Sequence, residues 1–282
     1  MARSRRSRPA GPGLRERLKR TASLLLSREV TVLNNAIAFN FLLCLFPLLL
    51  VLVAAAQRLS PGSGGANALR QLLGELIPIG GDTFATSLRQ MTRVAPGFQL
   101  FSLALIVWGS SGIFIPVERV LNHVWGARAE RSFWKSRLLA FLLTASCAAL
   151  ALLSLSLTLY GRSLGGRVSA YGQELAEPVA LVASWGAKAA AFVLGWALFG
   201  LVYRVAPSAR IDSGVAARAA LWAALAWEAS KYAFVWNLGR MQLSTLYGPL
   251  AFAVSLVLWA YVSSLVLVFG AGMAAGVAPP RD

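Results

Sequence analysis

Six long apolar stretches constrain this chain more than any other feature. Each is about as long as the twenty helical residues needed to cross the roughly 30 Å hydrocarbon core of a bilayer. The stretches are continuous rather than alternating, which favours helices over the strands of a lipid-facing barrel. We therefore predict an all-α polytopic membrane bundle with six transmembrane helices, near residues 34–56, 98–117, 138–160, 178–203, 215–237 and 248–275.

The composition supports lipid as the solvent. Of the 282 residues, 57% are apolar and 13% are charged, against about 45–50% and about 25% in soluble domains. This balance excludes an ordinary cytosolic enzyme. The formal net charge is +16, which in so apolar a chain indicates cytoplasmic loops and anionic headgroups rather than nucleic acid. We expect membrane lipids as partners and no nucleic acid.

Basic residues are concentrated before the first span and in alternate loops after it. The positive-inside rule then places both termini in the cytoplasm. This pattern predicts a basic cytoplasmic tail over residues 1–33, a membrane domain over 34–275 and a short cytoplasmic tail over 276–282. The first outer loop (57–97) carries two apolar stripes, which predict short amphipathic helices that cap a cavity or pack on the bundle ends.

The tail itself contains an amphipathic pattern. Apolar residues recur at helical spacing from Leu14 to Leu25, which predicts a helix lying in the plane of the inner membrane surface. A solvated tail that only sets topology is the alternative. Lipid headgroups would be contacted by the basic side chains around the stripe: Arg15, Arg17, Lys19 and Arg20.

Ionisable side chains inside the spans are the strongest functional indicators, because each costs several kcal/mol unless paired or hydrated. Glu228 and Lys231 lie three positions apart in span five, on one helix face. Lys188 lies in span four. Together they predict a polar cavity; the alternative is an internal ion pair with a lysine that extends to the interface.

Span one adds amides and a proline. Asn35 and Asn40 precede Pro47, which removes a backbone hydrogen bond and kinks the helix. A kinked helix with an inward-facing amide could line a substrate path. Packing between helices is the alternative role for these residues.

No catalytic or metal site is predicted. The chain has one histidine, His123, and two cysteines, Cys44 and Cys147, in apolar runs. These residues cannot supply three or four zinc ligands, and no phosphate-binding glycine-rich loop is present. We expect no cofactor and no enzymatic activity.

Several short motifs, in this order and spacing, together resemble the YihY/virulence factor BrkB family of bacterial inner-membrane proteins. The resemblance covers about residues 28–275, and its motifs lie at 35–39 with 45–48, 121–125 with 131–138, 203–210 with 227–232, and 247–250 with 259–271. It implies a six-span inner-membrane protein, and it implies that an older ribonuclease label of the family is a misassignment. Relatives usually carry an acidic residue where this chain has Gly272, so any role of that carboxylate is in doubt here.

Two functions remain open from the sequence. The first is a membrane protein that transports or handles a lipid-like amphiphile or a small solute. The second is a membrane scaffold or envelope-integrity protein that docks partners or anionic lipid through its basic tail. The sequence does not indicate the substrate, the coupling ion or the oligomeric state.

Overall fold

Helices account for nearly all of the chain that the computed structural model describes. The described residues are 13–59, 98–127, 131–132, 134–147, 149–150, 153, 173–238, 240–247 and 251–275, and they contain helices and turns but no strand. The bounds are α1 Leu14–Leu25, α2 Arg28–Leu59, α5 Phe98–Trp125, α7 Gln173–Val205, α8 Ser213–Leu238, α9 Leu243–Tyr247 and α10 Ala251–Ala275. Residues 134–147 are also helical.

The helices extend beyond the predicted spans. α2 begins at Arg28 rather than near residue 34, and α5 continues to Trp125 rather than ending near residue 117. A run of apolar residues shows only which part of a helix suits hydrocarbon. The polar turns before and after that run continue the same helix. Most of the outer loop, the second half of the third predicted span, and the tails 1–12 and 276–282 lie outside the described residues.

Two helical segments in the described ranges are apolar and long enough to cross a bilayer by length and composition. They are Lys188–Val205 in α7 and Ala253–Ala275 in α10. The described chain is therefore all-helical with two clear candidate spans, and the count of six stays a prediction.

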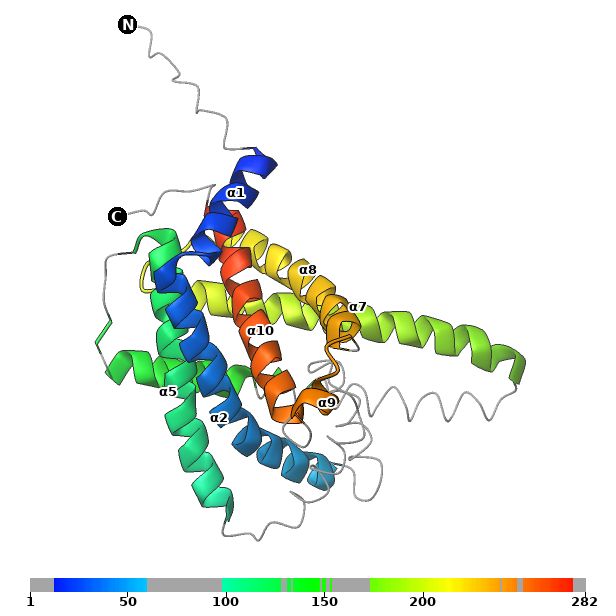
Figure 1. The fold of residues 1–282 in the computed structure, drawn as a ribbon. Coiled ribbons are helices and arrows are strands. Elements are labelled where there is room, and N and C mark those ends of the chain that lie inside the picture. Colours follow the sequence, from blue (N-terminus) through cyan, green and yellow to red (C-terminus); the bar gives the residue numbers. More distant parts are fainter. Residues whose placement is uncertain are drawn as a thin grey trace, which may run out of the picture.

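α10 is the hub of the bundle. It packs against α1, α2, α5, α8 and α9, whereas α7 packs mainly on α8 and projects away from the other helices (Figure 1). The contact of α10 with α8 is close because α8 presents a buried stripe made mostly of alanine, from Val215 to Ala224. A Cβ atom added at Gly270 would lie 2.7 Å from the carbonyl oxygen of Ala219 and 2.6 Å from the hydroxyl of Tyr203.

The opposite face of α8 is apolar and exposed. Leu221, Leu225, Tyr232 and Trp236 follow one another at helical spacing on this face. α7 also exposes large apolar side chains, among them Trp185 and Trp196. Continuous apolar surface of this kind suits contact with lipid rather than water.

α2 bends in its second half (Figure 1), the half that contains Pro47. An interior proline produces such a bend because it removes one helical hydrogen bond and crowds the preceding turn. Before the bend, Asn40 lies against Gly112 of α5: a Cβ added at Gly112 would come 2.0 Å from the amide oxygen of Asn40. Glycine at 112 therefore lets α2 and α5 approach closely.

Candidate functional site

Two charged side chains in the second half of α8 form an ion pair. Nζ of Lys231 lies 2.8 Å from Oε1 of Glu228, and the two side chains are 21% and 35% exposed, respectively. They follow Ala220 and Ala224 along the helix at a spacing that keeps them near the buried stripe. The pair, hereafter the α8 pair, therefore lies at the edge of the bundle-facing side of α8 and not on its exposed apolar face.

An aromatic cluster packs beside the α8 pair. The ring of Trp227 lies 5.0 Å from that of Trp259 and 6.0 Å from that of Phe199, and Phe234 lies 5.0 Å from Trp259. These rings join α7, α8 and α10, and Trp259 is buried. Because Trp227 lies four residues before Lys231 and Phe234 lies three residues after it, a charged and an aromatic surface adjoin each other here.

Lys188 is not brought to the α8 pair by any contact that the structure describes. Its side chain is exposed near the middle of α7, with Nζ 4.9 Å from the ring centroid of Trp185 on the same helix. The three charges predicted for one cavity are thus observed as one pair and one separate lysine over an aromatic ring.

The amides of span one have different environments. Asn35 is exposed, and Asn40 donates a hydrogen bond from Nδ2 to the carbonyl oxygen of Ala36 at 2.8 Å. The fully buried amide is Asn34, and neither its oxygen nor its nitrogen has a hydrogen-bond partner. The stripe of Val30, Asn34 and Ile37 at helical spacing was the signal that would have identified it.

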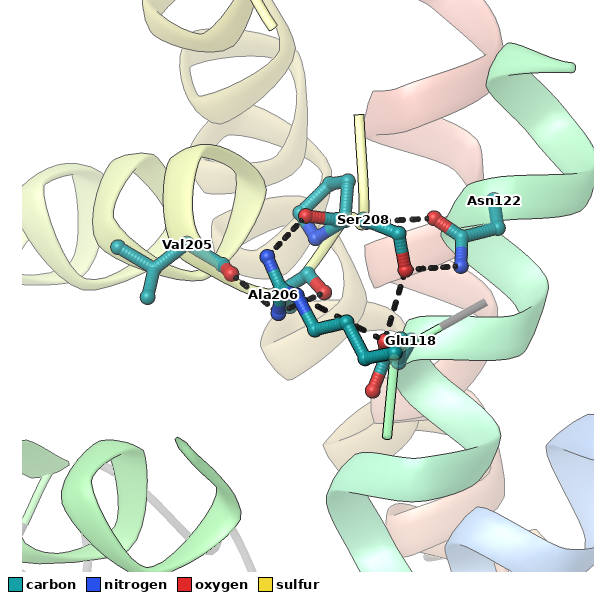
Figure 2. Close-up of polar contacts among 7 residues, drawn as sticks. Glu118, Asn122, Val205, Ala206 and Ser208 are labelled. Atoms are coloured by element: carbon teal, nitrogen blue, oxygen red, sulfur yellow. Dashed lines mark hydrogen bonds and ion pairs between the residues drawn. The ribbon is translucent and has the colours of Figure 1, made fainter. Parts of the chain in front are cut away.

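A second polar centre joins α5 to the turn between α7 and α8 (Figure 2). The hydroxyl of Ser208 donates to Oε1 of Glu118 at 2.8 Å and accepts from Nδ2 of Asn122 at 3.0 Å, while Oδ1 of Asn122 accepts from the Ser208 backbone N–H at 2.8 Å. Glu118 is 8% exposed. We call the residues Glu118, Asn122, Arg131 and Ser208 the clamp.

Arg131 completes the clamp by capping the end of α7. Its guanidinium donates to the carbonyl oxygens of Val205, Ala206 and Pro207 at 3.0, 3.1 and 2.6 Å, and Nε lies 4.0 Å from Oε1 of Glu118 (Figure 2). A cation at a helix carboxyl end satisfies unpaired carbonyls and complements the helix dipole.

The end of α5 directs the chain toward this position. Gly126 has a positive φ of 66°, and the Ala127 N–H donates to the carbonyl oxygen of Asn122 at 2.9 Å. This six-residue closure ends the helix and turns the chain away from its axis. Arg131 follows a few residues later, within reach of the α7–α8 turn.

Comparison with known proteins gives the family. The family model described as virulence factor BrkB matches residues 22–281, almost the whole chain. The chain belongs to the virulence factor BrkB family. The resemblance predicted from the motifs is therefore confirmed, and the chain is a membrane protein of this family.

The BrkB relatives are distant in sequence. A UPF0761 membrane protein of Aromatoleum aromaticum is 29% identical over 93% of this chain and 63% of its own length. One from Chromohalobacter salexigens is 25% identical over 88% of this chain and 59% of its own length. The Bacillus subtilis relative named ribonuclease-like protein YfkH is 23% identical, with 83% and 85% covered. The chain thus spans about three fifths of two of these relatives. No solved structure matches it.

Two of the BrkB-like motifs meet in the clamp. Asn122 and Arg131 come from the second motif and Ser208 from the third, although nearly ninety positions separate Asn122 from Ser208 in the chain. Within the described ranges, no three His, Cys, Asp or Glu side chains are grouped so that they could hold a metal ion.

The basic residues of α1 divide into two sets. Arg15 and Lys19 are exposed and line no groove that the structure describes, whereas Arg17 is half-buried and Arg20 is exposed. Arg17 and Arg20 line a groove between α1 and the end of α10, and Arg20 also pairs with Glu16 on the exposed side of α1. α1 is therefore docked on the bundle and not a free tail.

Proposed function

We propose that this BrkB-family membrane protein handles a lipid-like amphiphile or a small solute through a polar intramembrane cavity beside α8. The observation that carries the proposal is the α8 pair. A carboxylate and an ammonium within a membrane helix are expensive to desolvate, and such residues usually mark a pathway or a binding site. Their position at the edge of the bundle-facing stripe favours a cavity over the lipid surface.

The neighbouring aromatic cluster supports an amphiphile as the ligand. An amphiphile needs a charged partner for its headgroup and an apolar surface for its carbon chain. Glu228 and Lys231 supply the first, and the rings around Trp227 supply the second. Both residues of the pair lie on α8. Lys231 can therefore exchange its carboxylate partner for an anionic headgroup without breaking a contact between helices.

The proposed setting is the bacterial inner membrane, with six spans and both termini in the cytoplasm. Residues 1–33 would lie at the inner surface, 34–275 would form the membrane domain and 276–282 a short tail. In this setting Leu14 and Leu18, which are exposed, would enter the headgroup layer while Arg15 and Lys19 contact lipid phosphates. We propose a non-enzymatic role that uses no cofactor.

The test is flux of labelled lipids and small solutes in proteoliposomes. Wild-type protein should exceed protein-free vesicles for at least one class of compound, and Glu228→Ala should lower that flux at least about tenfold, as expected when a charged partner worth about 1.5–3 kcal/mol is lost. Arg119→Ala, which removes an exposed charge from α5, is the matched control and should retain wild-type flux. Flux equal to protein-free vesicles across the whole panel would reject the proposal.

A scaffold that docks partners or anionic lipid is the second candidate, because α1 is docked on α10 with Arg15 and Lys19 exposed. It predicts the opposite dependence on charge. Neutralising the basic residues of 1–20 would remove the cellular phenotype of the gene, and Glu228→Ala would not.

A further inference from the structure

A half-open groove of about 190 Å³ lies between α1 and the last turn of α10. Its walls are Arg17, Arg20, Thr21 and Leu24 from α1 and Gly272 and Ala275 from α10. The groove lies at the end of α10 that packs beside the start of α8, because Gly270 adjoins Ala219 and Ala223. It is therefore separate from the α8 pair, which lies farther along α8.

Glycine at position 272 shapes this groove. A Cβ atom there would lie 2.8 Å from Cγ2 and 3.0 Å from Oγ1 of Thr21. The branched Thr21 side chain is buried and has little freedom to move aside. Any side chain at 272 would thus push α1 away from α10 or fill the space between them.

The three polar side chains that line the groove, Arg17, Arg20 and Thr21, can all donate hydrogen bonds. Thr21 is 2% exposed, and its Oγ1 has no hydrogen-bond partner. Arg20 contacts Glu16 through one terminal nitrogen, and a guanidinium has five N–H donors in all. Two guanidinium groups and an unpartnered buried hydroxyl facing one groove are complementary to an anion with several oxygens.

Capping of α10 offers a simpler role for the two arginines. The last carbonyl groups of a helix attract cations, so Arg17 and Arg20 would be favourable there without any ligand. This role does not involve Thr21, whose hydroxyl would remain buried without a partner. A ligand oxygen in the groove accounts for all three side chains at once.

We propose that the groove holds the phosphate of an anionic phospholipid from the inner leaflet. Arg17, Arg20 and the Thr21 hydroxyl donate to the phosphate oxygens, and Leu24 and Ala275 contact the carbon atoms next to it. Basic pockets between membrane helices at the cytoplasmic surface bind lipid headgroups in this way. The site requires the topology proposed above, but it does not require that the protein transports anything.

The test is binding of fluorescent phosphatidylglycerol to the full-length protein in non-ionic detergent, with phosphatidylcholine as the neutral comparison. At about 0.3 M salt the Debye length falls below about 8 Å, so charges that do not contact the lipid directly contribute little. The double variant Arg17→Gln/Arg20→Gln should bind phosphatidylglycerol at least about tenfold more weakly, as two charge-assisted contacts are lost. Arg119→Gln/Arg204→Gln removes the same charge at two exposed positions outside α1 and should bind within about twofold of wild type.

Equal losses in the two double variants, or equal affinity for the two lipids, would overturn the proposal and leave the arginines as caps of α10. Thr21→Val gives a second, uncharged test. It should weaken phosphatidylglycerol binding about tenfold, because a hydrogen bond to a charged group is lost, and it should raise the melting temperature of lipid-free protein, because an unpartnered buried hydroxyl is removed. Unchanged lipid affinity in Thr21→Val would equally reject the site.

Inorganic phosphate separates the two sources of a phosphate group. At about 10 mM it should not displace the lipid, because it makes none of the contacts with Leu24 and Ala275 that add apolar burial. Full displacement would show that the groove is a site for free phosphate and would overturn the assignment to lipid. Since binding is measured in detergent without flux, this site can fail while the transport proposal stands, and the reverse also holds.

Discussion

The clamp and the α8 pair are two charged centres in one bundle, and they are built differently. In the clamp, Glu118 is 8% exposed and its hydrogen-bond network joins α5 to the turn before α8. In the α8 pair, Glu228 is 35% exposed and bonds to a residue three positions along the same helix. The first centre connects elements far apart in sequence, and the second connects a helix to itself.

This difference separates structural charges from charges that are available to a ligand. Losing Glu118 removes an acceptor of the Ser208 hydroxyl. Losing Arg131 removes the guanidinium bound to the carbonyl groups at the end of α7. In either case the cost falls on the fold. Among the described residues, the α8 pair makes no hydrogen bond or ion pair to another helix, and Glu228 lies about 22 Å along α8 from its first residue, Ser213, at 1.5 Å per residue. We therefore expect the clamp to control stability and the α8 pair to control function.

The largest effect is expected from Glu118→Ala. The substitution removes the acceptor of the Ser208 hydroxyl and the carboxylate nearest to Arg131, and breaking a buried charged network of this kind costs about 3–5 kcal/mol of unfolding free energy. Thermal stability in detergent, followed by the loss of the monodisperse species in size-exclusion chromatography, measures it. Arg119→Ala changes the neighbouring exposed residue and should cost less than about 1 kcal/mol. If the two variants have the same melting temperature, the clamp does not stabilise the fold.

Glycine substitutions probe the packing between α10 and α8. Gly270→Ala places a methyl group within 2.7 Å of the Ala219 carbonyl oxygen and of Ala223 Cβ, and such overpacking costs about 1–3 kcal/mol. Gly195→Ala is the matched change on α7, where nothing lies within 4 Å of the added atom. It should be neutral or stabilise α7 by up to about 1 kcal/mol through helix propensity. Melting temperatures of the two variants in the same detergent give the comparison, and a destabilised Gly195→Ala would contradict it.

A charge reversal tests whether the α8 pair is dispensable for folding. Glu228→Lys/Lys231→Glu keeps one charge of each sign three residues apart, so it should remain within about 1 kcal/mol of wild type, the usual value of partly exposed ion pairs. Its flux should nevertheless fall, because the cation has moved to another point of the cavity. If the reversed pair has a much lower melting temperature than wild type, these charges are structural, like those of the clamp.

The sequence predicted the positions of several helices, but not where α2 begins or where α5 ends. Long apolar runs determine where a helix can lie in hydrocarbon, and α7, α8 and α10 coincide with predicted spans to within a few residues. The end of α5 was missed because it depends on local backbone chemistry: Gly126 takes a positive φ and closes the helix beyond the apolar run. Hydropathy carries no information on such a closure.

The pairing of Glu228 with Lys231 was predicted, and the position of Lys188 was not. Spacing along one helix sufficed for Glu228 and Lys231, because residues three apart on a helix always adjoin. It could not place Lys188, since the position of a residue on α7 relative to α8 depends on how the two helices cross. The sequence could not predict the clamp for the same reason. Asn122 and Ser208 meet only through tertiary packing, and each motif by itself is a short polar segment.

The smallest effect is expected at a third contact, between a histidine and a carboxylate. Nδ1 of His123 lies 3.4 Å from Oε2 of Glu29, and these side chains are 41% and 65% exposed. The pair joins two helices, α2 and α5, as the clamp does. Its side chains are exposed, however, so water screens the interaction as it does in the α8 pair. A double-mutant cycle with Glu29→Gln and His123→Gln should give a coupling below about 0.5 kcal/mol. The equivalent cycle on Glu118 and Arg131 should exceed about 1 kcal/mol. Similar couplings in the two cycles would mean that linking two helices, and not burial, makes a charged contact structural in this bundle.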